Sequence, residues 1–478
     1  MTHKPLPASA RPIRSLITLA AVAGGAVLVG TLGATPGDGG GGSLIIGPDV
    51  IVGSVSDISK YGTVSGISAY SLGTTSCNIG DQVAWWIDTG TDDAHHPVIA
   101  QNIYRLKDGR LEQIGMSWVK HGFCALDGSL CGTCNVDPYG CDALGVGCSD
   151  PYGASLNGSQ SGLGPRSQIN ATTGVFPYPF TAPAAPATVG RRIQVLMSDL
   201  DPALNAGAQY FGEGHYITVD DCNAGTDNNN GAYRRITVGT ISSGSYTLSL
   251  SGATIQQKYG IQAWKDHGLG SGVPDPGVAI ASVDVQGDGR FHVASKVTTL
   301  TGGQYRYDYA VHNMNSNRAA RGFNVPLPAG VTAANLYCHD VPHHSGEPYA
   351  TTDWTAATTG AGVGWSTQSY AQNTNANALR WGTMFNFSFT CSSAPANGTA
   401  TIDLFNPGGA GDPMTAAVSV PVPSSPAVVG DLDGNGAVNG ADLGGLLAAW
   451  GTSGPADLNS SGTTDGGDLT MLLANWTG

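Results

Sequence analysis

A repeat close to the C-terminus constrains this 478-residue chain more than any other feature. The segment from Asp431 to Trp450 aligns without gaps to the segment from Asp457 to Trp476, and half of the aligned pairs are identical. Such repetition indicates one structural unit that is used twice. Each copy begins with an acidic, turn-rich stretch and ends with leucines at helical spacing. The sequence therefore predicts two loop–helix units over residues 430–478.

The acidic stretch of each copy has oxygen-bearing side chains at loop positions 1, 3, 5, 9 and 12 and glycine at position 6. Position 7 offers its backbone carbonyl. Calcium takes about six to eight hard oxygen ligands, and this spacing wraps such a set around one ion. We therefore predict two calcium ions as cofactors. The predicted ligands are Asp431, Asp433, Asn435, Ala437, Asn439 and Asp442 for the first ion, and Asp457, Asn459, Ser461, Thr463, Asp465 and Asp468 for the second.

Each loop leads into a short segment with apolar residues three or four positions apart. This spacing predicts an amphipathic helix with one apolar face. We expect the two apolar faces to pack against each other. The apolar positions are Leu443, Leu446, Leu447 and Trp450 in the first copy, and Leu469, Leu472, Leu473 and Trp476 in the second.

Aspartate, rather than glutamate, stands at loop position 12 in both copies, as Asp442 and Asp468. With this feature residues 430–478 resemble a dockerin type I module. The resemblance implies a small all-α calcium-binding domain that docks onto a cohesin-like partner. Loop positions 10 and 11 are Gly440-Ala441 and Gly466-Gly467, which offer little side chain for recognition. Attachment through another surface partner therefore stays open.

The N-terminus has the pattern of a secretory signal. Lys4, Arg11 and Arg14 precede an apolar run that ends in small residues near Ala34. We expect a signal peptide over residues 1–34, followed by a glycine-rich lead-in over residues 35–49. An uncleaved anchor is the alternative, because the apolar run is close to the shortest length that spans a bilayer. After cleavage we expect no membrane span and a secreted, extracellular or cell-surface protein.

The chain has nine cysteines, which fit an oxidising compartment. Five of them crowd one loop-rich stretch: Cys124, Cys131, Cys134, Cys141 and Cys148. We expect structural disulfides rather than zinc there, with the pairing left open. Residues 50–300 combine short strand-like runs with long loops, so we expect a cysteine-stapled β-rich domain.

Strand patterns become clearer from residue 301. Tyr305, Tyr307 and Tyr309 alternate with polar residues, which predicts a strand with one aromatic face. Further short strands between turn residues predict an antiparallel β-sandwich over residues 301–420. Cys338 and Cys391 lie near strand ends, so they are candidates for a disulfide. A proline- and serine-rich linker, residues 421–429, precedes the calcium module, and the predicted fold class is mainly β.

Histidines are the main candidates for transition-metal chemistry in the middle region. His95 and His96 are adjacent, and His339, His343 and His344 lie close together in sequence. Imidazoles grouped in this way can bind copper or zinc in an exported protein. Hydrogen-bonded loop histidines are the alternative, because the spacing matches no established motif. Four further histidines are dispersed: His121, His215, His292 and His312.

Other candidate residues are less specific. Glutamate is rare in this chain, so Glu213 and Glu347 are weighed as catalytic acids. Four aromatic residues in a region rich in asparagine and threonine either stack on sugar rings or pack in a core. These residues are Trp354, Trp365, Tyr370 and Trp381.

The formal net charge is -14 and no basic patch is evident, so we expect no nucleic-acid partner. Two classes of function remain. The first is a secreted or cell-surface protein with a non-catalytic binding or structural body, attached or assembled through the calcium module. The alternative is a secreted polysaccharide-acting hydrolase, or a copper or zinc enzyme, that uses the same tail for attachment.

Overall fold

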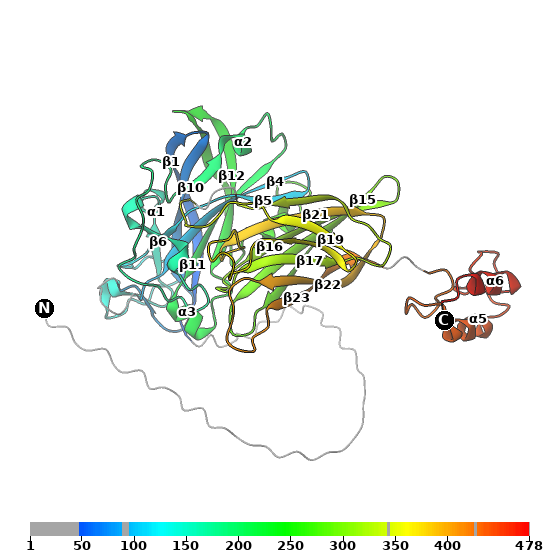
Figure 1. Ribbon diagram of the computed structural model, residues 1–478. Coiled ribbons are helices and arrows are strands. Elements are labelled where there is room, and N and C mark those ends of the chain that lie inside the picture. Colours follow the sequence, from blue (N-terminus) through cyan, green and yellow to red (C-terminus); the bar gives the residue numbers. More distant parts are fainter. Residues whose placement is uncertain (1–46, 88–94, 342–344, 425–427, 478) are drawn as a thin grey trace, which may run out of the picture. The chain divides into compact units, whose positions relative to one another are not determined.

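Strand pairing begins directly after the glycine-rich lead-in. The computed structural model describes residues 47–87, 95–341, 345–424 and 428–477. Within these residues the body is built from four antiparallel sheets and a small two-stranded pair (Figure 1). The expected mainly-β fold is therefore confirmed. The expected signal peptide, His343 and His344 lie outside the described residues.

The first sheet is organised around a long hairpin of its first two strands. Positive φ values of 51° at Ser65 and 80° at Gly66 form the turn between them. Such backbone favours glycine, which has no Cβ to clash. The strands of this sheet are β1 (Val50–Val64), β2 (Ile67–Asn78), β8 (Ser149–Tyr152) and β10 (Ile193–Leu196).

The second sheet has the strand order β13-β12-β11-β4-β6-β9, and β5 also pairs with β4. Its strands are β4 (Val98–Lys107), β5 (Arg110–Met116), β6 (Val119–His121), β9 (Leu163–Gly164), β11 (Gln209–Ile217), β12 (Gly231–Ser242) and β13 (Ser245–Gln256). The separate pair consists of β3 (Ala84–Trp85) and β7 (Ala143–Leu144). Short helices lie in the connections: α1 (Ala154–Asn157), α2 (Met197–Leu200), α3 (Val219–Ala224) and α4 (Gln262–His267).

The third and fourth sheets have five strands each. The third contains β14 (Val278–Asp284), β15 (Arg290–Leu300), β16 (Gln304–Asn313), β18 (Ala334–His339) and β21 (Thr383–Cys391). The fourth contains β17 (Ala320–Pro326), β19 (Thr355–Thr359), β20 (Gly362–Ser366), β22 (Pro395–Leu404) and β23 (Thr415–Pro423). One aromatic-rich core joins these two sheets as a sandwich. Two of its strands, β14 and β15, come before residue 301, where we expected the sandwich to begin.

The four sheets are stacked in numerical order. One core joins the first and second sheets, another joins the second and third, and the sandwich core joins the third and fourth. Figure 1 shows β1 and β10 at one end of this order and β17, β22 and β23 at the other. The second and third sheets are therefore covered on both faces.

Strand β21 shows the consequence of this stacking, because all nine of its residues are buried. Phe385, Phe387 and Phe389 face the sandwich core. On the opposite face, the Asn386 amide donates to the carbonyl oxygen of Leu111 at 2.7 Å. Alternation of apolar and polar residues usually indicates a strand with one solvent-exposed face. In β21 the same alternation belongs to a strand with two buried faces, one of them polar.

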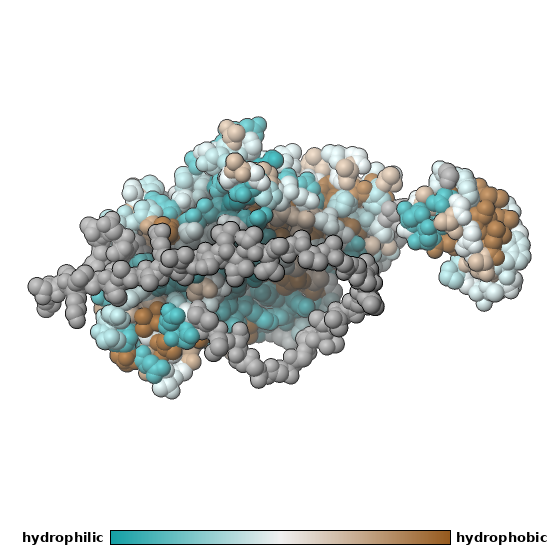
Figure 2. Space-filling model, turned by 90° about the horizontal axis from the view of Figure 1, so that it is seen from below, coloured by the Kyte–Doolittle hydropathy of each residue, from teal (hydrophilic) through white to brown (hydrophobic). Residues whose placement is uncertain are grey.

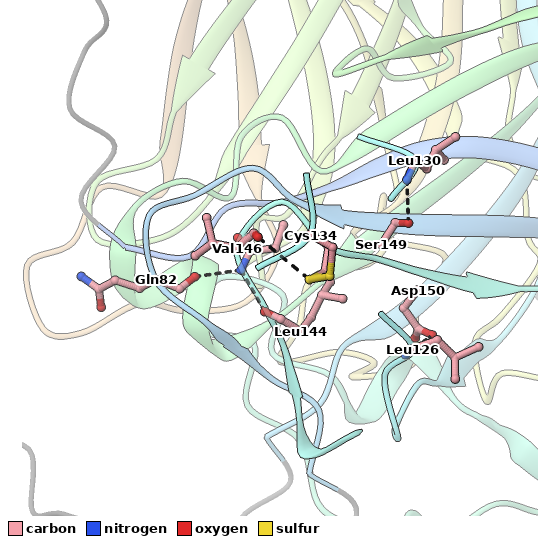
Figure 3. Close-up of a disulfide and its surroundings, with 10 residues drawn as sticks. Gln82, Leu126, Leu130, Cys134, Leu144, Val146, Ser149 and Asp150 are labelled. Carbon is pink, nitrogen blue, oxygen red and sulfur yellow. Dashed lines mark hydrogen bonds between the residues drawn. A yellow bond between two sulfur atoms is a disulfide. The ribbon is translucent and has the colours of Figure 1, made fainter. Parts of the chain in front are cut away.

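Three disulfides cross-link the loops beside the first sheet: Cys77–Cys131, Cys124–Cys141 and Cys134–Cys148. Figure 3 shows the surroundings of Cys134, where the Ser149 hydroxyl oxygen accepts a hydrogen bond from the Leu130 amide at 3.1 Å. Cys131 and Cys134 do not bond to each other but form disulfides with Cys77 and Cys148. The prediction of structural disulfides in this stretch is confirmed.

The candidate bridge between Cys338 and Cys391 is wrong. Both cysteines are free, as is Cys222. The register of β18 on β21 places Cys338 opposite Phe387, four residues before Cys391. Two cysteines that are offset along neighbouring strands in this way do not bring their sulfur atoms together.

The helix α5 (Gly440–Ala448) and the helix α6 (Gly466–Ala474) form the C-terminal part of the chain. Each follows one of the acidic loops, as the repeat predicts. Among the described residues, no helix is both long and apolar enough to cross a membrane.

Candidate functional site

The first acidic loop is held in shape by the carboxylate of Asp431. Its Oδ1 accepts hydrogen bonds from the amides of Gly434 (2.9 Å) and Asn435 (3.1 Å). Its Oδ2 accepts from the amide of Gly436 at 2.8 Å. Gly434 and Gly436 have φ values of 76° and 86°, a conformation that favours glycine. The loop therefore turns around an aspartate at its first position.

Asp442 closes the same loop from the first turn of α5. Its Oδ2 accepts from the Asn439 amide at 2.9 Å, and the Asn439 side chain accepts in return from the helix, which makes a capping box. Its Oδ1 accepts from the amides of Leu432 (2.7 Å) and Asp433 (3.1 Å). The amide of Asn439, followed by those of Asp433 and Leu432, lowers the pKa of Asp442 below its usual value. The side chain is thus a buried, charged link between loop and helix.

Three carboxylates converge in this loop. Oxygen atoms of Asp431, Asp433 and Asp442 all lie within 4.8 Å of one another. Like charges at this spacing repel unless a cation lies between them. Asn435 lies on the same loop, and its amide donates to Asp433 at 2.9 Å. The donor set is made of hard oxygen atoms, so these residues fit calcium.

The second loop repeats the turn but has fewer converging charges. Asp457 accepts from the amides of Ser461 (2.9 Å) and Gly462 (2.7 Å), and Gly462 has φ 99°. Asp468 accepts from the amides of Asn459 (3.0 Å) and Asp465 (2.7 Å), and the Asp465 amide is the main cause of its lowered pKa. Asn459 and Ser461 stand where the first loop has Asp433 and Asn435, so the second loop fits calcium less well.

The two helices share a small core of Val438, Leu446, Ala456 and Leu472. Leu443 and Leu469 are only partly buried. Two residues of each expected apolar face point to solvent instead, with exposed fractions of 53% for Leu447, 46% for Trp450, 51% for Leu473 and 41% for Trp476. Figure 2 shows brown, apolar residues gathered on one side of this part of the chain. The expected packing of the two apolar faces is therefore confirmed for Leu446 and Leu472 and wrong for the four exposed residues.

The structure brings His96 together with His121, a histidine from the dispersed set. His96 Nε2 lies 2.9 Å from His121 Nδ1, and His96 Nδ1 lies 2.8 Å from the carbonyl oxygen of Ile87. Because a carbonyl only accepts, His96 Nδ1 carries the proton and its Nε2 accepts from His121. Burial lowers the pKa of His121 to about 3, so the His121 ring is neutral. His95 is adjacent in sequence and half-buried.

His339 lies elsewhere, in a pocket of about 390 Å³. Glu112 and Asp199 line the same pocket and both bind Arg105, at 2.7 Å and 2.8 Å. Burial would raise the pKa of Glu112, but His339, Tyr337 and Arg105 together lower it. Burial raises the pKa of Asp199. The sequence missed this pair of acids because they are far apart along the chain.

Glu213 and Glu347 are buried rather than exposed to a substrate. Glu213 accepts from the side chains of Asn102 (2.6 Å) and Tyr104 (3.1 Å). Glu347 accepts from the Ser167 amide at 3.3 Å and from the Arg166 amide. Trp354, Trp365 and Trp381 are likewise buried, and only Tyr370 keeps a substantial exposed fraction, 39%. The core-packing interpretation therefore holds for the three tryptophans.

No known family model matches the chain, and no curated protein matches it in sequence. The resemblance of residues 430–478 to a dockerin thus depends on the spacing of the residues that are predicted to bind calcium. Within the described residues, no group of three metal-binding side chains that includes a histidine has its ligand atoms within 4.8 Å. The first acidic loop is therefore the best-formed candidate metal centre among the described residues.

Proposed function

We propose that this is an exported protein whose β-rich body is attached to a surface or assembly through a calcium-binding, dockerin-like tail. The observation that carries this proposal is the convergence of Asp431, Asp433 and Asp442 around one point of the first loop. Binding of a cation relieves the repulsion of these carboxylates and fixes the start of α5. The second loop takes a second ion more weakly. The body is then a non-catalytic binding or structural protein, either secreted or on the cell surface.

The exposed side chains of the helices support a docking role for the tail. Leu447 and Trp450 on one copy correspond to Leu473 and Trp476 on the other, and each is at least two-fifths exposed. Exposed aromatic and aliphatic residues of this kind mark interaction surfaces. The partner is a cohesin-like or other surface protein with a complementary apolar face. Residues 428–478 contain no lysine or arginine, so the tail offers a partner no positive side chain for ion pairs.

For the β-rich body, the pocket on the outer surface of the sandwich fits a polysaccharide best as the ligand. A pocket of about 390 Å³ lies over β17, β20 and β22 of the fourth sheet. Its lining includes Asn324, Ser366, Thr399 and Thr401, whose amide and hydroxyl groups both donate and accept. Sugar hydroxyls need partners of this kind.

Calcium titration of the full chain by calorimetry tests the attachment module. We expect two binding events, the tighter of which is lost in Asp431→Ala. Asp108→Ala is the matched control, because its carboxylate is exposed at the turn before β5 and belongs to neither loop. Heat of binding that is absent from the wild type, or unchanged in Asp431→Ala, would contradict the proposal.

A secreted hydrolase that acts on polysaccharides is the second candidate, favoured by the His339 pocket. Glu112 and Asp199 have pKa values shifted in opposite directions within one open pocket. Glycoside hydrolysis uses such a pair, with one carboxylate charged and the other protonated. Release of reducing ends from a polysaccharide by the wild type, lost in Glu112→Gln and kept in Asp412→Asn, would favour this candidate over the non-catalytic one. Asp412 is exposed in the loop between β22 and β23 and does not line the His339 pocket.

A further inference from the structure

A small pocket of about 90 Å³ is lined by segments that are far apart along the chain. Polar side chains form most of its lining. Arg166 and Ser167 follow β9, Ser316 and Asn317 lie between β16 and β17, and Arg380 precedes β21. The volume is larger than one bound water molecule needs, about 10–15 Å³. The pocket therefore has room for a small polar group of a ligand.

Two aromatic rings hold the guanidinium of Arg380 at this pocket. Its Cζ lies 4.2 Å from the ring centroid of Tyr349 and 4.5 Å from that of Phe405. Its Nη2 donates to the carbonyl oxygens of Thr374 (2.9 Å) and Ala376 (3.3 Å). These contacts fix the position of a planar donor group. Little conformational entropy is then lost when the group binds a ligand.

The positive charge of Arg380 is not balanced by a carboxylate. Neither Arg380 nor Arg166 forms an ion pair within the part of the chain that the structure describes. Burial lowers the pKa of both guanidinium groups, because it removes each charge from water. Nε of Arg380 is buried without a hydrogen-bond partner. Buried charges are usually paired, so this guanidinium lacks the anion that its surroundings require.

The acids near the pocket are already bound by backbone amides. Glu347 acts on the charge of both arginines, but it does not line the pocket and accepts from the amides of Arg166 and Ser167. Burial raises the pKa of Glu347 to about 7, so near neutral pH only part of the molecules carry its negative charge. Asp288 accepts from the Asn317 amide at 3.1 Å. The Arg380 charge is therefore left for a ligand.

We propose that this pocket binds the carboxylate of a small hydroxy acid or of a uronic acid unit, with Arg380 as the cation. A guanidinium presents its N–H groups in one plane, which matches the two oxygens of a carboxylate. The exposed amide of Asn317 lines the same pocket and can bond the hydroxyl next to the carboxylate. The pocket shares no residue with the acidic loops or with the outer sandwich pocket, so the proposal is independent of the proposed function.

Calorimetric titration of the full chain with sodium galacturonate and with sodium glycolate tests the proposal. Binding of glycolate assigns the pocket to hydroxy acids in general, and binding of galacturonate alone assigns it to acidic sugars. Galactose should bind at least about tenfold more weakly than galacturonate, because it has no carboxylate. Arg380→Gln should weaken binding of the acid by a similar factor. Arg321→Gln is the matched control, since Arg321 lies on β17 and does not line the pocket.

A second variant gives a readout that does not depend on the folding of Arg380→Gln. Asn317→Ala shortens an exposed side chain, so the melting temperature without ligand should stay unchanged while binding of the acid weakens. The acid that binds should also raise the melting temperature of the wild type, and galactose should not. Absence of binding by both acids, or unchanged binding in Arg380→Gln, overturns the proposal. Tighter binding of sulfate than of either acid overturns the assignment to a carboxylate.

Discussion

The acidic loops of the tail and the polar interior of the body both bring charged and polar side chains together. They differ in how far apart along the chain these side chains lie. Each loop gathers its oxygen atoms from a dozen consecutive residues, and backbone amides hold them in place. The polar interior gathers Arg166, Glu213, His215, His292 and His312 from strands and loops far apart along the chain. The first kind of site is readable from spacing, whereas the second exists only once the sheets have stacked. Four perturbations test how far this contrast extends.

The largest effect is expected from Arg166→Ala, which removes the centre of the polar interior. The guanidinium donates to the carbonyl oxygens of Ser117 (2.7 Å), Gly382 (3.0 Å) and Gln101 (3.0 Å) and to Asn102 Oδ1 (3.0 Å). Its loss removes these four buried hydrogen bonds and the positive charge that offsets the buried carboxylate of Glu213, so the free energy of unfolding falls by about 3–5 kcal/mol. Denaturant unfolding measures this change.

The matched control for Arg166→Ala is Arg321→Ala, on β17 of the fourth sheet, outside the contact between the second and third sheets. A small change there and a large one at Arg166 would locate the effect in that contact. Equal losses would mean that the polar interior is no more important than the surface of the sandwich.

Removal of the disulfide Cys77–Cys131 is expected to have the next largest effect. This bond joins residues 54 apart in sequence, whereas Cys134–Cys148 joins residues 14 apart. Chain-entropy arguments give losses of about 4 kcal/mol and about 3 kcal/mol for the two bonds. The double serine variants, compared by denaturant unfolding, test this order. A larger loss for Cys134–Cys148 would show that local packing, not loop length, governs the stability of this region.

Acid should loosen the two acidic loops of the tail. Backbone amides lower the pKa of Asp442 and of Asp468 in the folded chain. A carboxyl with a lowered folded pKa stabilises the fold above its unfolded value, about 3.9, and this contribution is lost as the pH falls through the folded value. In calcium-free buffer, amide shifts of Leu432 and Asn439 should therefore move below about pH 4. Asp442→Asn removes this transition, and an unchanged titration in that variant would disprove the assignment.

The smallest effect on stability is expected on the exposed face of the helices. Trp450→Ala lowers the free energy of unfolding by about 1 kcal/mol or less, because nearly half of the residue is already exposed to solvent. Leu446→Ala, in the small core of the same helix, costs about 2–5 kcal/mol of the stability of this region. Binding to a surface partner should show the reverse order. Loss of stability in Trp450→Ala would indicate that the ring packs on the chain itself.

The sequence predicted more of the sites than of the arrangement of the sheets. Strand alternation at Tyr305, Tyr307 and Tyr309 correctly gave the aromatic face of β16. The same alternation could not tell that Asp308 and His312, on the other face, are buried. Whether the polar face of a strand meets water or another sheet depends on what stacks upon it, and that information is not local. The pairing of His96 with His121 was missed for the same reason.

The sequence alone determined the two acidic loops, the helices that follow them and the crowding of cysteines that became disulfides. Each depends on residues within a few turns of chain, where spacing fixes geometry. Only the tertiary structure decided which cysteines pair, which apolar residues of α5 and α6 stay exposed, and that His215, His292 and His312 are buried. Burial and long-range contacts are properties of stacked sheets, so no single strand carries them in its own residues.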